Sequence, residues 1–470
     1  MKEIIRRFEY LLWEKDIPDK KYVESLFQKM VPAEIPGTWR WEDVNYEGRE
    51  RSAWSAADHY KRIRLILKGF GRQRMSENEE YTAKMTGALK YWLINDFINP
   101  NWWLNEIGMP QNIGDVAIMM RPVLDKETLT RATELVSRGS MEKNGKIAAD
   151  WTGANLIWGA LNTIRHALLT EDEQLLHIAS GRISQEITVD SEEGIQEDYS
   201  FFQHGPRLYS GGYGRDFIYE LSIIIFLLNK TDFALPGEKT DIILSFLLDG
   251  LRFMIQKDSL DWACVGRELV RVNATHVGLI RNALKFVLET QDLPRKDEIK
   301  AFLESTQGGA QPDMTKYFEK AFMLCHHFNG IYVGAKFLNN RLLGAEVCNS
   351  EGELCYNMSY GTHTCIMRNG AEYRNIFPVW DYSRIPGTHI EATVEKKVGS
   401  WHRNSRDLSD NPVSAQVVTL TINYSVGQQC KYAYMISAAD LPAPDVDVLQ
   451  NDSGAQSIRL PDGSIMSVFH

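Results

Sequence analysis

Apolar residues recur at helical spacing through the first two thirds of the chain. The stretch "NLIWGALNTIRHALL" places Leu156, Ala160, Leu161, Ile164 and Leu168 along one side of a helix, as expected for 3.6 residues per turn. The stretch "TDIILSFLLDGLRFMI" repeats the pattern further along. Such helices, joined by short polar turns, predict stacked helical hairpins. Without a strict sequence repeat, a bundle, a solenoid and a closed toroid all stay open.

The periodicity changes to alternation after about residue 330. "THTCIMR" leads into Asn369-Gly370, a hairpin-turn dipeptide, and "AEYRNIFPVW" follows it. "QVVTLTINYS" and "KYAYMIS" alternate, and "SIRL" and "SIMSVF" flank a Pro-Asp-Gly turn. Helices first and strands afterwards predict an α+β chain of separate domains. We expect a helical domain over 1–325 and an antiparallel β-sheet domain over 326–470.

Composition narrows the choice of partners. The chain has 470 residues, is 44% hydrophobic and 24% charged, and carries a formal net charge of −10. This charge argues against nucleic acid or an anionic membrane as the main partner. An acidic substrate stays possible if arginines are gathered locally. The N-terminal "MKEIIRRFEYLLWEKD" has no apolar core of a signal peptide, and the apolar run "IIIFLL" is too short to span a bilayer.

The six cysteines show neither C-x-x-C nor zinc spacing. We therefore expect no catalytic metal and no cofactor, although a structural cation would be compatible with the sequence.

A turn-rich stretch, "FFQHGPRLYSGGYGRDF", carries the first candidate site residues. His204 and Tyr213 lie on either side of a run of glycines and a proline, which rules out a regular helix between them. Turn-rich segments can direct titratable side chains into a cleft. The alternative is a surface loop that happens to contain a histidine and two tyrosines.

Two arginines in "VGRELVR" form the second candidate. Arg267 and Arg271 are four residues apart, which predicts one helical face. Like charges at this spacing cost stability unless they meet anions, and Glu268 would lie on another face. A pair of guanidinium groups suits carboxylate or sulfate groups. A solvated surface pair is the alternative.

Two further stretches hold polar or aromatic candidates. Trp102 and Trp103 are adjacent in "NPNWWLNEIGMP" and cannot both face one core. Either one is buried and one lies at the rim, or both form a platform for sugar rings. Asn155, in "DWTGANLIW", lies at or near a helix start, where asparagine usually acts as a cap.

Taken together and in order, these stretches resemble polysaccharide lyase family 8, the chondroitin AC, hyaluronan and xanthan lyases. "NSEGELCYNMSYG" and "GAEYRNIFPVWDYSRIPGT" add to the resemblance in the β part. The resemblance implies an (α/α) toroid followed by antiparallel β-sheets, with a long cleft for an acidic polysaccharide. It implies catalytic roles for Asn155, His204, Tyr213, Arg267 and Glu351, and substrate contacts by Trp102, Trp103, Gln203 and Arg271.

The sequence also departs from the family pattern. Tyr199, in "EDYS", stands where the family commonly has glycine, and Gly352 stands where it commonly has asparagine. A short polar bridge, "KVGSWHRNSRDLSDNP", replaces a longer run of strands, and the chain ends early. We therefore expect a reduced sheet domain.

The chemistry that the resemblance implies is β-elimination at a uronic acid, giving a 4,5-unsaturated product. Asn155 and His204 would neutralise the uronate carboxylate, and Tyr213, acidified by Arg267, would move the proton. A glycoside hydrolase on a similar toroid and a non-catalytic glycosaminoglycan-binding protein are the alternatives. The family is mostly exported, which implies a secreted or periplasmic location. The polymer, its sulfation, endo or exo action and the oligomeric state stay open.

Overall fold

The structure is a computed structural model that describes part of the chain. The described residues are 1–143, 146–147, 151–189, 191–337, 341–344, 346–352, 363–375, 377–379, 391–400, 412–421, 447–451, 455–459 and 465–469. The chain divides into two compact units, one of 1–386 with 395–417 and one of 387–394 with 418–470. All candidate site residues belong to the first unit.

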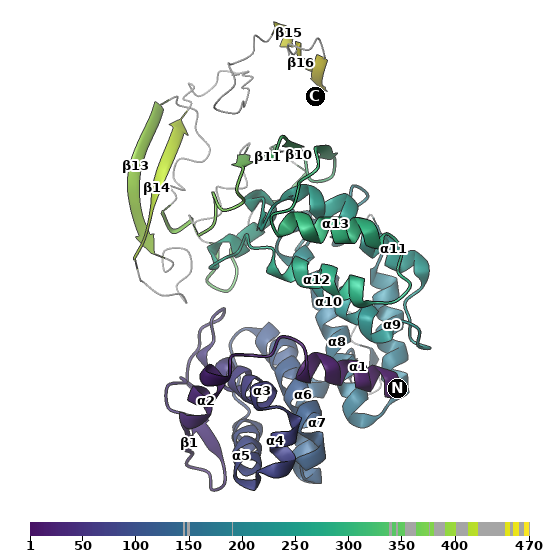
Figure 1. Cartoon of the computed structure of the whole chain (residues 1–470), viewed down its shortest axis with the longest axis vertical. Helices are drawn as coiled ribbons and strands as arrows, with labels where there is room; N and C mark the ends of the chain where they lie inside the picture. Colours follow the sequence, from purple (N-terminus) through teal and green to yellow (C-terminus); the bar gives the residue numbers. More distant parts are fainter. Residues whose placement is uncertain are drawn as a thin grey trace. The chain divides into compact units, whose positions relative to one another are not determined.

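The first unit is built mainly from helices (Figure 1). In chain order they are α1 (Lys2–Trp13), α2 (Lys20–Gln28), α3 (Asp58–Phe70), α4 (Arg72–Glu77), α5 (Glu79–Asn95), α6 (Met109–Met120), α7 (Lys126–Ser137), α8 (Gly153–Thr170), α9 (Glu173–Glu186), α10 (Tyr213–Leu228), α11 (Gly237–Ser245), α12 (Gly278–Glu289) and α13 (Lys296–Thr306). Short 3₁₀ or π turns are η1 (Ser55–Ala57), η2 (Leu104–Gly108), η3 (Arg121–Val123), η4 (Phe246–Gly250), η5 (Leu251–Met254), η6 (Trp262–Cys264), η7 (Gly266–Val270) and η9 (Phe377–Val379).

The helices form two layers, as expected for the predicted (α/α) toroid. One layer is a row in which α6 packs on α8, α8 on α10 and α10 on α12. Helices α7, α9 and α13 pack against members of this row from outside, and α1 contacts α3, α6 and α10. A helix in the row is covered on several sides, so α8 buries Leu156, Trp158 and Leu161. This explains why its sequence is apolar around most of its circumference. The predicted helical architecture is confirmed.

The change from helices to strands comes earlier than the sequence pattern predicts. The last helix, α13, ends at Thr306, and β9 (Met314–Phe318) and β10 (Met323–Phe328) both begin before residue 326. In β10, Met323 and Cys325 are buried and alternate with half-buried positions. This five- to six-residue alternation is too short to be separated from the preceding helical pattern by periodicity alone. The division at 325/326 itself stays a prediction.

A four-stranded antiparallel sheet follows, in the order β12-β11-β10-β9. Its remaining strands are β11 (Ile331–Lys336) and β12 (His363–Met367). The prediction of a hairpin about Asn369-Gly370 is wrong for the described residues. Strand β12 pairs with β11, whereas residues 372–375 form a turn before η9. The sheet packs on η5 and η6 through β9, β10 and β12, so its apolar face is covered by the helical part of the same unit.

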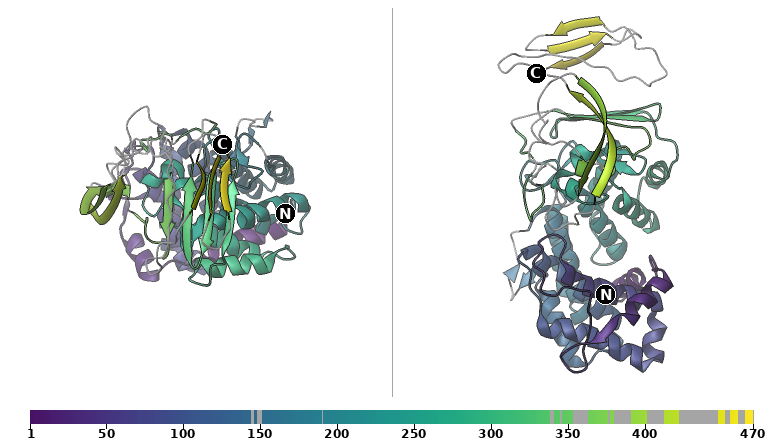
Figure 2. Two further views of the ribbon diagram at one scale, coloured as in Figure 1. Left: turned by 90° about the horizontal axis from the view of Figure 1, so that it is seen from above. Right: turned by 90° about the vertical axis from the view of Figure 1, so that its left-hand side faces the viewer.

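The remaining strands form small sheets, whose members run side by side in Figure 2. Strand β13 (Glu391–Ser400) pairs with β14 (Pro412–Thr421), and β15 (Asp447–Asn451), β16 (Ala455–Arg459) and β17 (Ile465–Phe469) form an antiparallel sheet. The strands predicted at "QVVTLTINYS", "SIRL" and "SIMSVF" are confirmed at β14, β16 and β17. "KYAYMIS" lies outside the described residues. Within the helical part, two-residue or three-residue strands pair as β1 (Met30–Pro32) with β2 (Trp39–Trp41), β3 (Glu142–Lys143) with β4 (Lys146–Ile147), β5 (Gly194–Ile195) with β6 (Phe201–Phe202), and β7 (Ile255–Gln256) with β8 (Ser259–Leu260).

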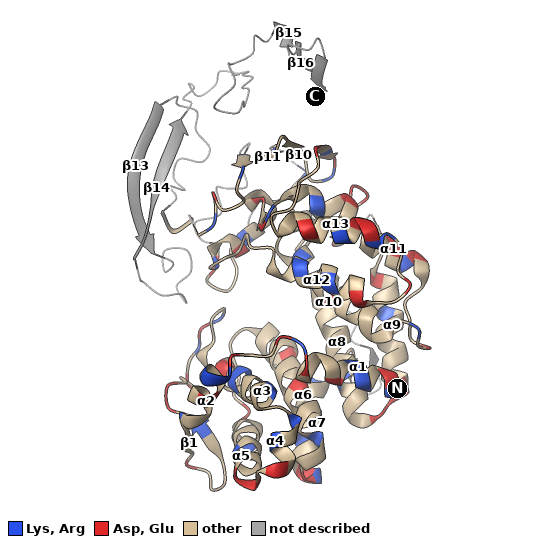
Figure 3. Ribbon diagram, viewed as in Figure 1, with Lys and Arg blue, Asp and Glu red and all other residues tan. Residues whose placement is uncertain are grey.

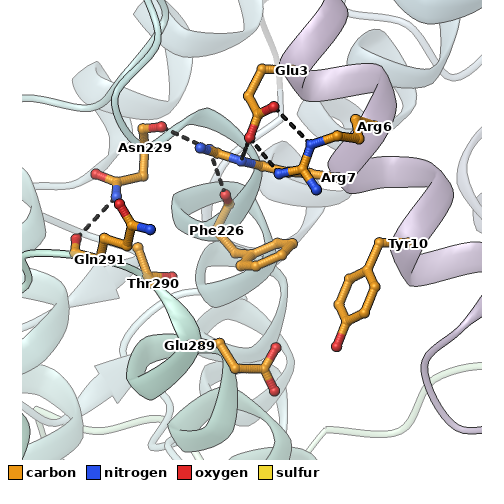
Figure 4. A pocket seen from close by; sticks show the side chains of 9 residues that line it. All are labelled: Glu3, Arg6, Arg7, Tyr10, Phe226, Asn229, Glu289, Thr290 and Gln291. Atoms are coloured by element: carbon orange, nitrogen blue, oxygen red, sulfur yellow. Dashed lines mark hydrogen bonds and ion pairs between the residues drawn. The ribbon is translucent and has the colours of Figure 1, made fainter.

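A pocket of about 330 Å³ lies where α1 meets the ends of α10 and α12 (Figure 4). Arg7 lies in its wall, and its Nη1 donates to the carbonyl oxygens of Phe226, Leu227 and Asn229 at 3.0, 3.0 and 2.7 Å. These carbonyls belong to the C-terminal end of α10, where four backbone oxygens have no partner within the helix. Arg7 therefore caps α10, and this pocket is part of the scaffold.

We expect Arg7→Met to lower the free energy of unfolding by about 2 kcal/mol, because three backbone carbonyl groups lose their charged hydrogen-bond donor. Arg6→Met is the matched control. Arg6 is on the same helix, its side chain is 69% exposed, and it pairs only with Glu3 in the described part of the chain. Its loss should have little effect on the free energy of unfolding, because the pair with Glu3 is exposed to solvent. Urea denaturation of both variants gives the comparison, and equal effects would contradict the capping role of Arg7.

Candidate active site

His204 is presented by a short hairpin. Strand β6 pairs with β5, Phe202 forms a bridge with Leu208, and the backbone N–H of Tyr209 donates to the carbonyl of Phe201 at 2.8 Å. His204 lies in the loop between them with φ of 58°. This left-handed conformation is uncommon for a residue other than glycine and is often found at functional sites. The turn expected from the glycines and proline is therefore present, and it holds the imidazole at its tip.

The glycines after the hairpin allow two segments to approach closely. A Cβ on Gly212 would lie 2.8 Å from the carbonyl oxygen of Val265. The backbone N–H of Gly211 donates to the carbonyl of Cys264 at 2.8 Å. Helix α10 then begins at Tyr213. The small residues thus bring the start of α10 against the segment that leads into η7, which carries Arg267.

The Arg267 guanidinium is buried among the other candidate residues. Its Nη2 donates to the Tyr213 hydroxyl at 2.9 Å, and its Nη1 is hydrogen-bonded to Glu346. Its Nε lies 3.4 Å from Oε2 of Glu351. Arg267 is 3% exposed, so each of these contacts is made away from bulk water. The guanidinium joins a residue at the start of α10 to two carboxylates from the segment 346–352.

The prediction that Arg267 and Arg271 lie on one face of a helix is wrong. The 3₁₀ helix η7 ends at Val270, and Arg271 has extended backbone angles of −87° and 147°. The two arginines therefore do not share a helical face. They share an anion instead, because Glu351 also accepts from Nε and Nη2 of Arg271 at 2.8 and 2.9 Å. The pair meets a carboxylate of the protein itself.

The prediction that Glu268 lies away from the arginines is also wrong. It is 2% exposed, and its carboxylate lies 3.1 Å from Nη1 of Arg271 and 3.2 Å from Nη2 of Arg215. Burial acts to raise the pKa of Glu268, but Arg271, Arg215 and Arg267 together hold it below its usual value. Glu268 is therefore an ionised partner within the cluster.

Glu351 reaches the arginines from a two-residue turn. Cys348 and Glu351 exchange backbone hydrogen bonds of 3.0 and 2.9 Å, and Asn349 and Ser350 between them have φ of 53° and 62°. Two positive φ values are typical of a tight hairpin turn. The family resemblance implies a catalytic role for Glu351, and its carboxylate is paired with Arg267 and Arg271.

Sequence reasoning missed the carboxylate that contacts His204. Oε2 of Glu346 lies 2.8 Å from Nδ1 of His204, and Oε1 accepts from the Tyr209 hydroxyl at 2.8 Å. Tyr209 is fully buried and packs edge-on against Tyr213, with ring centroids 5.1 Å apart. Tyr209 lies inside the turn-rich stretch and was visible there as one of two tyrosines, whereas no local pattern marks Glu346.

Asn155 lies in the first turn of α8, between two residues that contact the cluster or the His204 hairpin. Trp158 lies one turn after it, on the same side of the helix, and the Trp158 ring is 6.1 Å from that of Tyr213. Asn155 is half-buried, and its side chain makes no hydrogen bond within the described ranges. The backbone N–H of Ala154, just before it, donates to the side chain of Gln203 at 3.1 Å. The α8 start and the His204 hairpin are thereby tied together, and the Asn155 amide is available.

The Gln203 side chain joins two neighbouring segments of the chain. It is fully buried, and its amide nitrogen donates to Glu193 at 2.5 Å while its oxygen serves Ala154. Glu193 also accepts from Thr152 at 2.7 Å and from the backbone of Gly205 at 3.0 Å. The predicted substrate contact by Gln203 therefore finds no support, because its amide is occupied in joining the two segments.

The adjacent tryptophans divide between rim and interior. Trp102 is 46% exposed, and its ring stacks on Trp151 at 6.4 Å. Trp103 is half-buried and packs edge-on against Trp158 at 5.1 Å. Both rings contact the segment around the start of α8. Trp102 thus offers an aromatic face to solvent beside Trp151, which precedes Asn155 by four residues in the sequence, and Trp103 is part of the support.

Burial sets the acid–base character of the site. It raises the pKa of the Tyr213 phenol, and Arg267 offsets the increase only in part. The expected net acidification by Arg267 is therefore not found, because desolvation of the phenolate outweighs the nearby positive charge. Burial and then Arg267 lower the pKa of His204. The Glu346 carboxylate beside Nδ1 acts in the opposite direction.

The two departures from the family pattern have local consequences. Tyr199 adopts φ of 62°, a conformation in which glycine carries no penalty. Gly352 has φ of 87°, and a Cβ there would lie 2.3 Å from the carbonyl oxygen of Glu346. An asparagine would not fit at Gly352 without moving the segment that holds both glutamates.

The described residues contain no group of three or more His, Cys, Asp and Glu side chains suited to a metal ion. Within the same residues, no helix is both long and apolar enough to cross a membrane.

The chain belongs to polysaccharide lyase family 8. The family's N-terminal alpha-helical domain matches residues 21–305, and its super-sandwich domain matches residues 313–393. The chain is 30% identical over 364 residues to the chondroitinase-AC of Pedobacter heparinus, covering 74% of this chain and 50% of that protein. It is 20% identical over 405 residues to the xanthan lyase of Bacillus sp. (strain GL1), covering 74% and 43%. The chain thus spans about half the length of these curated relatives.

Solved structures support the same fold. A chondroitinase AC lyase studied as enzyme–oligosaccharide complexes matches with a TM-score of 0.85 at 20% identity, covering 100% of this chain and 88% of that one. The Streptomyces coelicolor A3 chondroitin AC lyase in complex with chondroitin sulphate matches with a TM-score of 0.75 at 12% identity, with the same coverage. The family membership expected from the motifs is confirmed.

We expect Gly266→Ala to be strongly destabilising. Gly266 has φ of +65°, and a Cβ there would lie 2.0 Å from the Tyr209 ring. Gly37→Ala is the control, because Gly37 has φ of +75° with no atom within 4 Å of its Cβ position. The control should cost about 1 kcal/mol for the left-handed backbone alone. Gly266→Ala should cost at least about 2 kcal/mol more from overpacking, as measured by urea denaturation. A similar cost for both would mean that Tyr209 is not held against η7.

Proposed function

We propose that this protein is a polysaccharide lyase that cleaves a uronate-containing acidic polysaccharide by β-elimination, with chondroitin or hyaluronan as the preferred polymers. Family membership supports the reaction class. The observation that carries the proposal is the arrangement in which Arg267 donates to the Tyr213 hydroxyl at 2.9 Å while the His204 ring lies 5.0 Å from the Tyr213 ring. This places a proton-transferring phenol beside two groups that can interact with an anion.

The reaction begins at C5 of the uronate ring. The C5–H bond breaks, its electron pair forms the C4–C5 double bond, and the glycosidic C4–O bond breaks. The intermediate has enolate character, so it forms readily only if the charge of the carboxylate is neutralised. The Asn155 amide and His204 are assigned to that carboxylate. Asn155 suits this role because its amide is half-buried and has no hydrogen-bond partner in the described part of the chain.

Tyr213 is assigned both proton transfers. Its phenolate takes the C5 proton, and the phenol then gives that proton to the departing glycosidic oxygen. Burial makes the phenolate scarce in the free enzyme, since it raises the pKa of Tyr213. The Nη2–H bond from Arg267 is directed at the oxygen on which the negative charge forms. Arg267 therefore stabilises the phenolate when it is needed.

We assign contacts with the polymer to the site residues whose side chains are exposed to solvent. The Arg271 side chain is 42% exposed while Glu351 and Glu268 hold its guanidinium. We assign Arg271 to the anionic groups of the polymer and Trp102 to a sugar ring. Lysines, arginines, aspartates and glutamates are interspersed along the helices in Figure 3. With a net charge of −10, attraction of a polyanion has to come from local groups such as Arg271.

A glycoside hydrolase is the second candidate because two carboxyl groups on α10 have a raised pKa. Burial raises the pKa of Asp216 to about 6 and that of Glu220 to about 7. A hydrolase requires one protonated and one ionised carboxyl group at the scissile bond. The carboxylates that contact Arg267, however, are ion-paired. The product decides, since hydrolysis gives a saturated uronate and elimination an unsaturated one.

We also propose a secreted or periplasmic location and a reaction without a cofactor. The location follows from the substrate, because acidic polysaccharides of this class are extracellular. The sequence offers no cysteine or histidine spacing typical of a catalytic metal site.

We expect Tyr213→Phe to bind a uronate polymer and to lose turnover by at least about 100-fold, because only the proton-transferring oxygen is removed. The ring contacts with His204, Tyr209 and Trp158 are retained. Ultraviolet absorbance of the unsaturated product measures turnover on chondroitin, dermatan, hyaluronan, xanthan and alginate. Binding is measured by calorimetry.

The same assay tests the ionisation of Tyr213. Below the raised pKa of Tyr213, the phenolate fraction grows about tenfold per pH unit, while the fraction of cationic His204 falls by the same factor above its lowered pKa. If both forms are needed, the wild-type rate should rise up to the pKa of His204 and then stay level towards alkaline pH. Near-normal kcat in Tyr213→Phe would overturn the assignment. Binding without product from any polymer, in the wild type, would favour the non-catalytic alternative.

Removal of divalent metal should leave turnover unchanged. The proposed elimination gives carboxylate neutralisation to Asn155 and proton transfer to Tyr213. The enzyme is dialysed against EDTA, its fold is checked by circular dichroism, and turnover is measured at matched ionic strength because binding of a polyanion is sensitive to salt. Loss of activity with an intact fold, restored by calcium or magnesium, would show that a metal neutralises the carboxylate.

A further inference from the structure

Glu346 is the one described residue that contacts His204, Tyr209 and Arg267 through a single side chain. Its Oε2 lies 2.8 Å from Nδ1 of His204, and its Oε1 lies 2.8 Å from the Tyr209 hydroxyl and is hydrogen-bonded to Nη1 of Arg267. The side chain is 13% exposed. It comes from the segment 346–352, 142 residues after His204 in the sequence.

The contact with Glu346 fixes which nitrogen of His204 carries a proton. An ionised carboxylate only accepts hydrogen bonds, so Nδ1 must be the donor. Nε2 is then the unprotonated nitrogen of the neutral ring, and no hydrogen bond to it is seen within the described residues. The His204 side chain is 32% exposed, so Nε2 is the ring atom that a ligand can reach. With Nδ1 already protonated, Nε2 can donate to an anion only when the ring is a cation.

The contact with Arg267 fixes the second half of the site. A guanidinium is planar, and its N–H groups have fixed directions. Glu346 holds Nη1, and Glu351 lies 3.4 Å from Nε on the opposite edge. With Nη1 bonded to Glu346 and Nε within ion-pair distance of Glu351, Nη2 is directed to the Tyr213 hydroxyl. Rotation of the group would break one of these anchors.

We propose that Glu346 is a positioning residue that holds His204 in its Nδ1-protonated form and aligns Arg267 on Tyr213. The inference rests on the proposed function for its kinetic consequences, but its effect on His204 is independent of any substrate. Glu351 has a different task, because its carboxylate contacts Arg267 and Arg271 and makes no described contact with His204. Glu346 therefore contacts His204 and the arginine that donates to Tyr213, whereas Glu351 pairs with Arg267 and Arg271.

The sign of the effect on His204 follows from the charges around it. Glu346, Glu193 and Glu268 favour the cationic ring, whereas Arg267 and Arg207 disfavour it. The neutral rings of Tyr209 and Tyr213 complete its surroundings. Removing the Glu346 charge must lower the pKa of His204, so the fraction of cationic imidazole at a given pH falls.

Glu346→Gln and Glu346→Ala separate charge from geometry. Glutamine is nearly isosteric and keeps an oxygen that accepts from Nδ1, whereas alanine removes the acceptor. The control is Glu351→Gln, which changes charge in the same segment without touching His204. The full chain is labelled with ¹⁵N-histidine, the ring nitrogens are followed through a pH titration by NMR, and His204 is assigned with His204→Asn.

In the wild type we expect the neutral His204 ring to carry its proton on Nδ1. Glu346→Gln should keep this tautomer and titrate at lower pH, and Glu346→Ala should shift the ring towards the Nε2 tautomer. Glu351→Gln should preserve the Nδ1 tautomer. On the preferred polymer, kcat should fall at least about tenfold in Glu346→Gln, and further in Glu346→Ala, with KM changed less than about threefold.

An unchanged tautomer and titration in both Glu346 variants would overturn the positioning role. A changed titration with normal kcat would show that the contact does not serve turnover. If Glu346→Ala does not fold, the titration of Glu346→Gln alone decides. If the wild type releases no unsaturated product from any polymer, the proposed function fails, whereas the NMR result still decides whether Glu346 sets the state of His204.

Discussion

The buried guanidinium of Arg267 is the interaction on which the site depends. It contacts the hydroxyl of Tyr213 and the carboxylates of Glu346 and Glu351. These partners come from the start of α10 and from the segment 346–352, so one side chain joins the helical part to the residues after strand β11. Moving it would separate the phenol from both carboxylates at once.

Such a cluster is stable only when it is complete. Desolvating a charged group costs several kcal/mol, and loss of one partner from a buried ion pair typically costs 3–5 kcal/mol. Glu268 illustrates the balance. Burial raises the pKa of its carboxyl group, but three arginines lower that pKa by a larger amount, so the net shift is downward. The glycines around the cluster serve the same end, because Gly212 and Gly266 let the chain segments approach closely enough for these contacts. The charged cluster therefore requires close backbone packing, because its partners can pair only when these segments lie next to each other.

The sequence predicts the parts of this structure that are encoded locally. The apolar pattern predicts α8, and the breaker-rich stretch predicts a turn between His204 and Tyr213. Glu346 could not be found in this way, because its contact with His204 spans 142 residues and depends on the tertiary fold. Arg271 was misplaced because a helical face was assumed, whereas η7 is a 3₁₀ helix that ends one residue earlier. The family resemblance implied the remaining candidate residues, and finding their partners required the structure.

The exposure of the site residues suggests how a polymer would engage them. His204 and Arg271 are 32% and 42% exposed, whereas Tyr213 is 8% exposed and Arg267 3%. A polyanion would meet the exposed cation first, and the phenol lies beneath. The burial that raises the pKa of Tyr213 also strengthens the hydrogen bond from Arg267, because both effects arise from exclusion of water. In the mechanism proposed above, the site would keep the phenol protonated before the polymer binds and hold in place the donor that stabilises its phenolate during proton transfer.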